Sequence, residues 1–208
     1  TSLSIADLDG DNDIDLLVGG ANDDFIHVIE NINGYTLWNN IATFTLGGVR
    51  DIETGDLDND GDLEIVACNG GKIVFYDNLD DSPDFGAEQE IVSAGNPFSI
   101  KVGDMDQDGY NDVVAGEDSF YGMGWFRNIN GTGEFEDIDL QIFYNSQGSY
   151  IDIGDLDSDG DLDICYAITN SSNIGWIPSL LGEPFQIAGD LFFDENDENL
   201  PPQDDDYL

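Results

Sequence analysis

The sequence predicts an all-β protein, a β-propeller built from four four-stranded blades of roughly 50 residues each. An acidic motif recurs with its first Asp at residues 7, 56, 104 and 155, in steps of 49, 48 and 51 residues. A second marker recurs in phase with it and ends at Asn31, Asn78, Asn128 and Ser179. No segment shows a sustained helical period with capping residues, so we expect strands throughout.

Each unit contains four runs with the composition of strands. Short alternating segments such as "YIDIGD" precede the acidic motif, and runs rich in Val, Ile and Leu, such as "LEIVACNG", follow it. The second marker ("HVIEN", "VFYDN", "GWFRN", "GWIPS") predicts a third strand, and a later apolar run ("IATFTL", "EIV", "QIF", "FQIA") predicts a fourth. Four short strands separated by turn signals are typical of a propeller blade. The resulting division is 1–49, 50–97, 98–148 and 149–189.

Two features of the organisation stay open at this level. Residues 190–208, which contain "DENDEN" and "QDDDYL", form either an acidic tail or a truncated fifth repeat. Four blades could close on themselves, belong to a larger propeller, or form an open array whose free sheet edges recruit other chains.

The charge balance excludes several classes of partner. The chain has 46 Asp and Glu against 4 Lys and Arg, for a formal net charge of −42. Such a surface repels phosphate backbones and anionic lipid, which argues against nucleic-acid binding. No stretch approaches the roughly 20 apolar residues of a membrane helix, so we expect no membrane insertion. Hydrophobic residues make up 40% of the chain, which is enough to form a packed core.

The acidic motif has the donor set of a site for a hard cation. Numbered from its first Asp, every copy has a carboxylate at positions 1, 3, 5 and 9. Position 6 is Gly61, Gly109 or Gly160 in three copies and Asn12 in the first, and both residue types tolerate a left-handed backbone. The predicted ligands are Asp7, Asp9, Asp11, Asp15; Asp56, Asp58, Asp60, Glu64; Asp104, Asp106, Asp108, Asp112; Asp155, Asp157, Asp159 and Asp163.

Calcium is the cation that this donor set favours. Clustered carboxylates repel one another, and a divalent ion converts that repulsion into attraction. Ca²⁺ takes six to eight oxygen ligands in flexible geometry, whereas zinc and copper favour His and Cys, which no loop contains. An EF-hand is excluded, because its bidentate Glu at position 12 is replaced by Val18, Ala67, Ala115 or Tyr166. The alternative is an acidic solvated turn that binds no metal.

The motif D-x-D-x-D-G-x-x-D, followed by a Val/Ile-rich strand, resembles the FG-GAP or VCBS repeat, and "GWFRNINGTGEF" is similar to a segment common in VCBS arrays. The resemblance implies blades like those of integrin α-chains and of secreted bacterial propellers, with one Ca²⁺ per blade, about four in all. It also implies a backbone carbonyl ligand from position 7. Those residues are Asp13, Asp62, Tyr110 and Asp161. Loop 1 lacks the usual Gly, loop 2 closes with Glu64, and family propellers usually have more blades.

Catalytic motifs are absent from the sequence. No G-x-S-x-G, Walker or dinucleotide-binding pattern occurs, and the single His27 lies in a predicted strand. Cys68 and Cys165 have the context of buried free thiols. Trp125 and Trp176 occupy one repeat position and are expected in the blade core, whereas Trp38 has no counterpart and is the better candidate for an exposed contact. We therefore expect no enzyme, although paired carboxylates leave a glycan-active enzyme as a minor alternative.

The sequence as a whole predicts an extracellular or cell-surface, calcium-stabilised propeller module that serves recognition or adhesion, with a protein or glycan partner. Its acidic surface fits a saline or marine setting. The second hypothesis is a structural subunit of an extracellular filament or matrix that self-associates through blade edges. The third is an accessory or catalytic domain of a polysaccharide-degrading enzyme.

Overall fold

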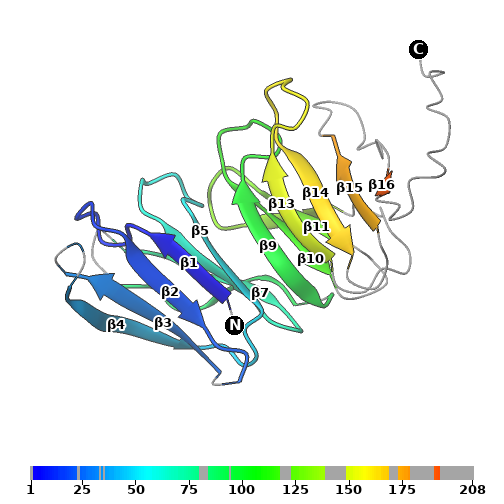
Figure 1. The fold of residues 1–208 in the computed structure, drawn as a ribbon. Coiled ribbons are helices and arrows are strands. Elements are labelled where there is room, and N and C mark those ends of the chain that lie inside the picture. Colours follow the sequence, from blue (N-terminus) through cyan, green and yellow to red (C-terminus); the bar gives the residue numbers. More distant parts are fainter. Residues whose placement is uncertain are drawn as a thin grey trace, which may run out of the picture.

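The computed structural model is an all-β molecule of four antiparallel four-stranded sheets (Figure 1). The structure describes residues 2–22, 24–32, 34, 36–79, 84–93, 95–117, 123–138, 149–168, 173–178 and 190–192. Every regular element within these ranges is a strand. The described residues contain no helix that is long and apolar enough to cross a bilayer.

Each sheet, here called a blade, is a meander in which consecutive strands pair. Blade 1 contains β1 (Ser2–Ala6), β2 (Asp15–Gly19), β3 (Phe25–Asn31) and β4 (Trp38–Thr45). Blade 2 contains β5 (Asp51–Gly55), β6 (Glu64–Cys68), β7 (Ile73–Tyr76) and β8 (Gln89–Val92). Blade 3 contains β9 (Pro97–Gly103), β10 (Asp112–Glu117), β11 (Met123–Asn128) and β12 (Phe135–Ile138). Blade 4 contains β13 (Ser149–Gly154), β14 (Asp163–Ile168), β15 (Asn173–Ile177) and β16 (Asp190–Phe192).

The prediction of four four-stranded units is confirmed, but two fourth strands lie elsewhere than expected. In blade 3 the fourth strand is β12, which begins six residues before the predicted run "QIF" at 141–143. In blade 4 it is β16, which lies just beyond residue 189, where the predicted repeats end. The runs "QIF" and "FQIA" fall outside the described residues. An outer strand has one neighbour, so its composition constrains its position less than that of an inner strand.

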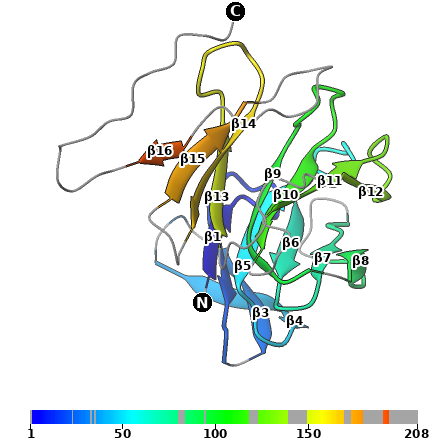
Figure 2. The same cartoon turned by 90° about the vertical axis from the view of Figure 1, so that its right-hand side faces the viewer.

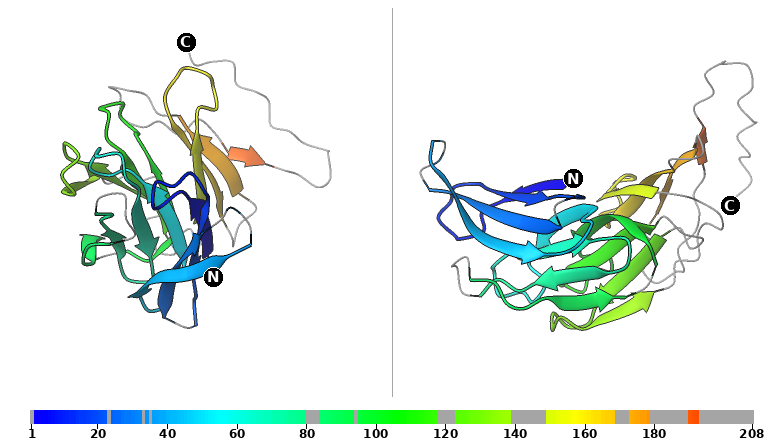
Figure 3. Two further views of the ribbon diagram at one scale, coloured as in Figure 1. Left: turned by 90° about the vertical axis from the view of Figure 1, so that its left-hand side faces the viewer. Right: turned by 90° about the horizontal axis from the view of Figure 1, so that it is seen from below.

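The blades radiate from a shared inner edge. Their first strands, β1, β5, β9 and β13, follow one another side by side (Figure 2). Their fourth strands lie at the outside of the molecule. Seen from below, the sheets follow a curve with blade 1 at one end and blade 4 at the other, and they do not close into a ring (Figure 3). The arrangement is therefore an open propeller.

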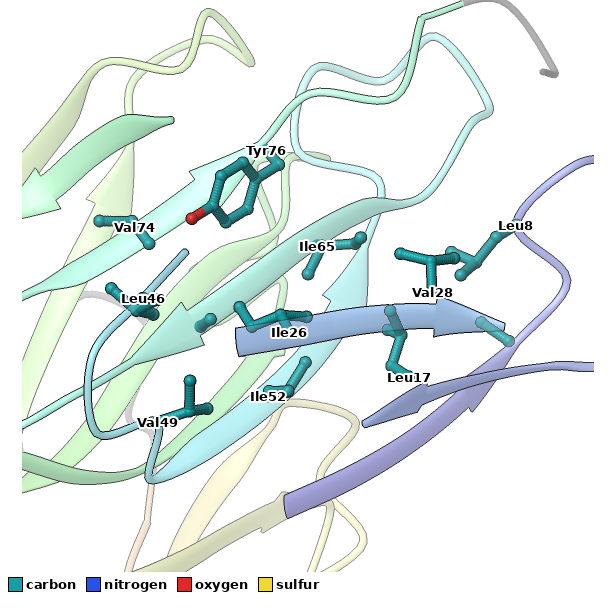
Figure 4. Close-up of a cluster of buried hydrophobic side chains, with 12 residues drawn as sticks. Leu8, Leu17, Ile26, Val28, Leu46, Val49, Ile52, Ile65, Val74 and Tyr76 are labelled. Atoms are coloured by element: carbon teal, nitrogen blue, oxygen red, sulfur yellow. The ribbon is translucent and has the colours of Figure 1, made fainter. Parts of the chain in front are cut away.

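The hydrophobic core is divided into three clusters, and each lies between two consecutive blades. Figure 4 shows the first, in which Leu17, Ile26 and Val28 of blade 1 meet Ile52 and Ile65 of blade 2. Strands in the middle of the stack are covered on both faces, so β6, β7 and β10 are buried along their whole length. In β2 of blade 1, by contrast, every second residue is only partly buried. This pattern shows that blade stacking, rather than any single sheet, forms the core.

The two cysteines differ in burial because of their place in this stack. Both are free thiols, as predicted. Cys68 is fully buried between blades 2 and 3. Cys165 is only partly buried, which contradicts the prediction, because it lies on the face of blade 4 opposite the one that packs on blade 3.

Candidate metal centres and the inner-strand pocket

The four acidic loops share one backbone conformation. Each loop joins the first and second strands of its blade. In every loop the Oδ2 atom of the position 1 Asp accepts a hydrogen bond from the position 6 amide, over 2.9, 3.2, 3.0 and 3.2 Å in loops 1 to 4. The position 5 carboxylate accepts the position 7 amide in every loop, over 2.7, 2.9, 3.0 and 3.2 Å. Four separate segments thus fold into the same turn, which is held by Asp side chains that accept hydrogen bonds from nearby backbone amides.

Two positions of each loop have a left-handed backbone. Position 6 has φ of 69° at Asn12 and 93° to 103° at the three glycines, as the sequence predicted. Position 4 is also left-handed, and sequence reasoning missed it. Its residues are Gly10, Asn59, Gln107 and Ser158, with φ of 72°, 63°, 56° and 66°. Gly10 and Asn59 are the types that favour this region, but Gln and Ser gave no such signal.

Each loop brings three carboxylates to one point. In loops 1, 2 and 4 the residues at positions 1, 3 and 9 each place one oxygen within 4.8 Å of the others. In loop 3 the corresponding group combines positions 1, 3 and 5. The groups are Asp7, Asp9, Asp15; Asp56, Asp58, Glu64; Asp104, Asp106, Asp108; and Asp155, Asp157, Asp163. The predicted ligands Asp11, Asp60, Asp112 and Asp159 lie in the same loops but outside these groups.

The geometry of position 1 in loops 1 and 2 fits a bound hard cation. Oδ1 of Asp7 and Oδ1 of Asp56 are buried and accept no hydrogen bond, although Oδ2 of each holds the position 6 amide. A buried carboxylate oxygen without a donor is costly, and a cation is the partner that removes the cost. The oxygen-only donor set matches Ca²⁺.

The position 9 carboxylate also anchors the blade. Asp15 accepts the amide of Leu8 over 2.9 Å and that of Asn31 over 2.9 Å, so it ties the loop to β3. Asp112 accepts the amides of Met105 and Asn128 in the same way. The sequence predicted only a metal ligand at this position; the backbone contacts are an additional role. Since a carboxylate has about four acceptor sites, the two roles are compatible.

Burial makes several of the loop carboxyl groups harder to ionise. Burial raises the pKa of Glu64 to about 7 and that of Asp112 to about 6. Burial also raises the pKa of Asp9 and of Asp58, and neighbouring carboxylates add to both shifts. Each raised pKa reflects the unfavourable free energy of placing negative charge in a partly desolvated loop.

One further side chain reaches loop 3. The residue before the marker Asn on the third strand is Glu30, Asp77 or Arg127 in blades 1 to 3. Arg127 contacts Oδ2 of Asp106 over 2.5 Å through Nε and Oδ2 of Asp108 over 3.1 Å through an Nη atom. Glu30 and Asp77 instead add negative charge near their loops and help raise the pKa of Asp9 and Asp58. Loop 3 is therefore partly neutralised by the protein itself.

Inner strands of all four blades line a cavity of about 570 Å³. Its wall contains Phe98 and Tyr150, whose rings meet edge to face with centroids 4.8 Å apart. Arg50 lies over the Phe98 ring, 5.8 Å from its centroid, and Lys101 pairs with Glu53. Asp51 and Asp152 add carboxylates. The cavity thus combines aromatic rings with hydrogen-bonding groups of both charges, a pattern that the sequence alone did not reveal because its residues are far apart in the chain.

Other residues singled out in the sequence lie as follows. His27 contacts Thr43 and Asn40 on the surface of blade 1, away from the acidic loops. Trp125 packs against the third core cluster and donates from Nε1 to Asp112 over 3.1 Å. Trp38 is 47% exposed, as expected.

Comparison with solved structures places this arrangement among propeller-like domains. The biofilm matrix protein Bap1 of V. cholerae aligns with a TM-score of 0.56 and 20% identity over 88% of this chain. BBS1N, solved in complex with ARL6DN, aligns with TM-scores of 0.58 and 0.60 at 14% and 13% identity, over 90% and 92% of this chain. The chain spans 29% of the Bap1 chain and 57% of the BBS1N chain. No curated relative matches in sequence.

The sequence of the chain also matches a repeat family. The FG-GAP-like repeat matches three times, over residues 7–67, 56–115 and 104–166. Each match begins at the first Asp of an acidic loop and continues past the next loop into the strand that follows it. With four stacked blades, four equivalent acidic loops and these matches, the chain belongs to the FG-GAP-like repeat family.

Proposed function

We propose that this chain is an extracellular calcium-stabilised module for recognition or adhesion. The observation that carries the calcium assignment is the repeated loop, with three carboxylates converging in each of four blades and partnerless inner oxygens on Asp7 and Asp56. About four ions would bind, one per loop, through positions 1, 3, 5 and 9 and the position 7 carbonyl. Bound calcium would neutralise the clustered charge and so couple ion binding to folding.

The fold neighbour Bap1 is described as a biofilm matrix protein, and a role in a matrix or in adhesion is consistent with an extracellular, saline location for this chain. Millimolar calcium outside cells matches the affinities of roughly 10⁻⁴ to 10⁻³ M that extracellular modules have. The net charge of −42 is tolerated best where salt screens it.

Removing two carboxylates of one loop tests the calcium assignment. Asp56→Asn combined with Asp60→Asn should lower the calcium stoichiometry by one ion, measured by equilibrium dialysis and metal analysis. The matched control replaces two exposed acids outside the loops, Asp84→Asn with Glu90→Gln, and should leave the count unchanged. An unchanged count in the loop variant would remove that loop from the assignment.

The inner-strand pocket is the surface that we propose for the partner, and its chemistry favours a neutral glycan. Aromatic rings stack on the apolar faces of sugars, while carboxylates and basic side chains bind hydroxyl groups. Tyr150 is 54% exposed at the pocket, so its ring is available for such a contact. We propose binding rather than catalysis: His27 contacts Thr43, Asn40 and Phe25 on blade 1 and does not line the pocket.

A glycan array followed by calorimetry tests this pocket. Tyr150→Ala should weaken the binding of any glycan that the chain captures by about tenfold, the loss of roughly 1.4 kcal/mol of ring contact. Trp38→Ala removes an aromatic ring of similar exposure from the outer strand β4 and should leave affinity unchanged. Loss of binding in Trp38→Ala alone would move the recognition surface to β4.

A further inference from the structure

A short chain of hydrogen bonds crosses from blade 2 to blade 3 and connects their position 9 carboxylates. Glu64 of loop 2 accepts the backbone amide of Leu57 over 2.5 Å. The Leu57 carbonyl accepts the side-chain amide of Asn128, which ends β11 of blade 3, over 2.5 Å. The backbone amide of Asn128 donates to Oδ1 of Asp112 in loop 3 over 2.8 Å. Only two residues therefore separate the position 9 carboxylates of loops 2 and 3.

The same chain of hydrogen bonds connects loops 1 and 2. Asp15 accepts the amide of Leu8, and the Leu8 carbonyl accepts the side-chain amide of Asn78 from blade 2, each over 2.9 Å. The backbone amide of Asn78 is hydrogen-bonded to Glu64. We call Asn78 and Asn128 the bridging asparagines. They are 1% and 0% exposed, so breaking one of these bonds would leave a polar group without water.

A second hydrogen bond joins loops 2 and 3. The Asn111 side chain, at position 8 of loop 3, donates to the backbone carbonyl of Asp56 over 2.9 Å. That carbonyl belongs to the same peptide group as the Leu57 amide, so one peptide unit donates to Glu64 and accepts from the next blade. We call the two hydrogen bonds from Asn111 and Asn128 to loop 2 the bridge.

Loops 3 and 4 are joined differently. Blade 4 has Ser179 where blades 2 and 3 have a bridging asparagine, and this residue lies outside the described part of the chain. The side chain of Gln107, in loop 3, donates to the Gly160 carbonyl of loop 4 over 2.8 Å. Gln107 is exposed, so water competes for this hydrogen bond. The bridge between loops 2 and 3 is therefore the place to look for communication between sites.

We propose that the bridge couples the calcium sites, so that occupation of loop 2 raises the affinity of loop 3, and the reverse. The inference rests on the proposed binding of calcium, and it makes Asn111 and Asn128 positioning residues. Once Glu64 is fixed by a bound ion, Leu57 is fixed with it, and its carbonyl holds the asparagine that orients Asp112. Loop 3 then loses less conformational freedom when it binds its own ion, which gives positive coupling.

The indole of Trp125 offers a reporter for loop 3 alone. Its Nε1 atom donates to Oδ2 of Asp112 over 3.1 Å, so its fluorescence is sensitive to the arrangement of that loop. Replacing Trp38 and Trp176 by Phe leaves Trp125 as the single tryptophan of the chain. Calcium titrations followed by this signal then give the midpoint of loop 3.

Emptying loop 2 while observing loop 3 tests the coupling. Asp56→Asn with Asp60→Asn removes two carboxylates of loop 2 and should raise the calcium concentration at the loop 3 midpoint. Both acceptors of the bridge are backbone carbonyls, so these substitutions leave the bridge in place. The factor by which the midpoint rises is the quantity compared below.

The same pair of substitutions is then made in a chain without the bridge. Asn111→Leu and Asn128→Ser each introduce a residue that another blade has at that position, Leu63 and Ser179. The rise in the loop 3 midpoint should be at least about fivefold larger with the bridge than without it. The charge removed from loop 2 is the same in both backgrounds, so the difference between them isolates the bridge from electrostatics.

Asn31→Ser is the matched control. Asn31 is the counterpart of the bridging asparagines in blade 1, where it is 5% exposed and donates to Ile14 of its own loop over 3.2 Å. Asn128 makes the corresponding bond to Asn111 in addition to the bridge. The control therefore removes a within-blade hydrogen bond of the same kind, and it should leave the response of loop 3 to loop 2 unchanged.

Equal midpoint rises with and without the bridge would overturn the coupling. Equilibrium dialysis of the wild type separates this result from a failure of the calcium assignment. About four bound ions with equal rises would reject the coupling alone, whereas a count of zero would reject calcium binding and the coupling with it. If Asn128→Ser does not fold, Asn111→Leu alone removes one of the two hydrogen bonds and should reduce the rise in part; an unreduced rise would again contradict the proposal.

Discussion

A single side chain sets loop 3 apart from the other acidic loops. Arg127 pairs with Asp106 and Asp108, two of the three carboxylates that converge there. The guanidinium supplies part of the positive charge that an ion would otherwise provide, and it must move or share those oxygens when calcium binds. Loop 3 is therefore expected to be the weakest of the four sites.

Replacing Arg127 should strengthen calcium binding at loop 3. Unit charges about 4 Å apart in water interact by about 1 kcal/mol, and a divalent ion experiences twice that. Arg127→Gln should thus raise the affinity of the weakest site by up to about thirtyfold in a calorimetric calcium titration. Lys72→Gln removes an equal charge from an ion pair with Glu88, outside the loops, and is the matched control. Equal affinities in the two variants would contradict a specific role for Arg127.

The pH dependence of stability should change with calcium. Burial raises the pKa of Glu64 from 4.5 to about 7 and that of Asp112 from 3.8 to about 6 in the ion-free fold. A carboxyl group whose pKa is higher in the folded chain than in the unfolded chain stabilises the fold most at a pH below its unfolded-state pKa. This stabilisation is lost as the pH rises through the folded-state pKa. With chelator present, the melting temperature should therefore decrease from pH 5 to pH 7.5.

Saturating calcium should remove that decrease, because the ion binds the ionised carboxylates. Thermal unfolding across this pH range, with chelator and with calcium at matched ionic strength, checks both expectations. If the melting temperature changes with pH in the same way with and without calcium, then Glu64 and Asp112 do not bind the ion.

At this scale the sequence predicted the chemistry of the loops better than their backbone. Spacing alone placed carboxylates at positions 1, 3, 5 and 9, and three of these four converge in each loop. The backbone at position 6 is left-handed, as predicted. Position 4 was missed because Gln107 and Ser158 take a left-handed conformation that their residue types seldom adopt. The anchoring role of Asp15 was missed because it depends on the amides of Leu8 and Asn31, whose proximity arises only in the folded blade.

At the scale of elements, the unit of stability is the junction between two blades. Each core cluster draws one set of residues from a blade and the other from its neighbour. The loop residue at position 2 belongs to the junction and not to its own sheet. Leu57 is 1% exposed where blade 3 covers it, and Leu156 is 53% exposed on blade 4, which no other described blade covers.

The same substitution at these two positions should have very different effects. Leu57→Ala should lower the free energy of unfolding by about 2 to 5 kcal/mol, since it leaves a cavity in the second core cluster. Leu156→Ala should change it by less than about 0.5 kcal/mol in the single chain. Chemical denaturation of the two variants, measured where the chain is monomeric, gives the comparison. Similar losses would mean that stability resides within each sheet.

Strand positions could be predicted from the sequence wherever a strand is covered on both sides. The runs that form β6 (EIVAC) and β10 (DVVAGE) have consecutive Val, Ile or Ala residues at their centres because both faces of each strand are buried. The fourth strand of blade 3 was predicted too late in the sequence for two reasons. The strand β12 pairs with β11 alone, and its sequence "FEDI" is less apolar than the later run "QIF". Edge strands are fixed by their neighbour's register more than by their own composition.

At the scale of the whole molecule, charge and shape act together. A net charge of −42 on an open curve of four blades opposes both folding and self-association until cations reduce it. The sequence predicted the number of blades but not whether they close, because closure depends on the small rotation between successive sheets. It also gave no indication of the inner-strand pocket, whose wall is assembled from first strands about 50 residues apart in the chain.

Calcium bound in the repeated loops is expected to stabilise the whole propeller. Differential scanning calorimetry in millimolar calcium, and again with excess chelator at matched ionic strength, tests it most directly. Each occupied site contributes about 1.4 kcal/mol when calcium is tenfold above its Kd, so four sites should raise the melting temperature by about 10 to 20 °C. A melting temperature that is the same with calcium and with chelator would contradict the account.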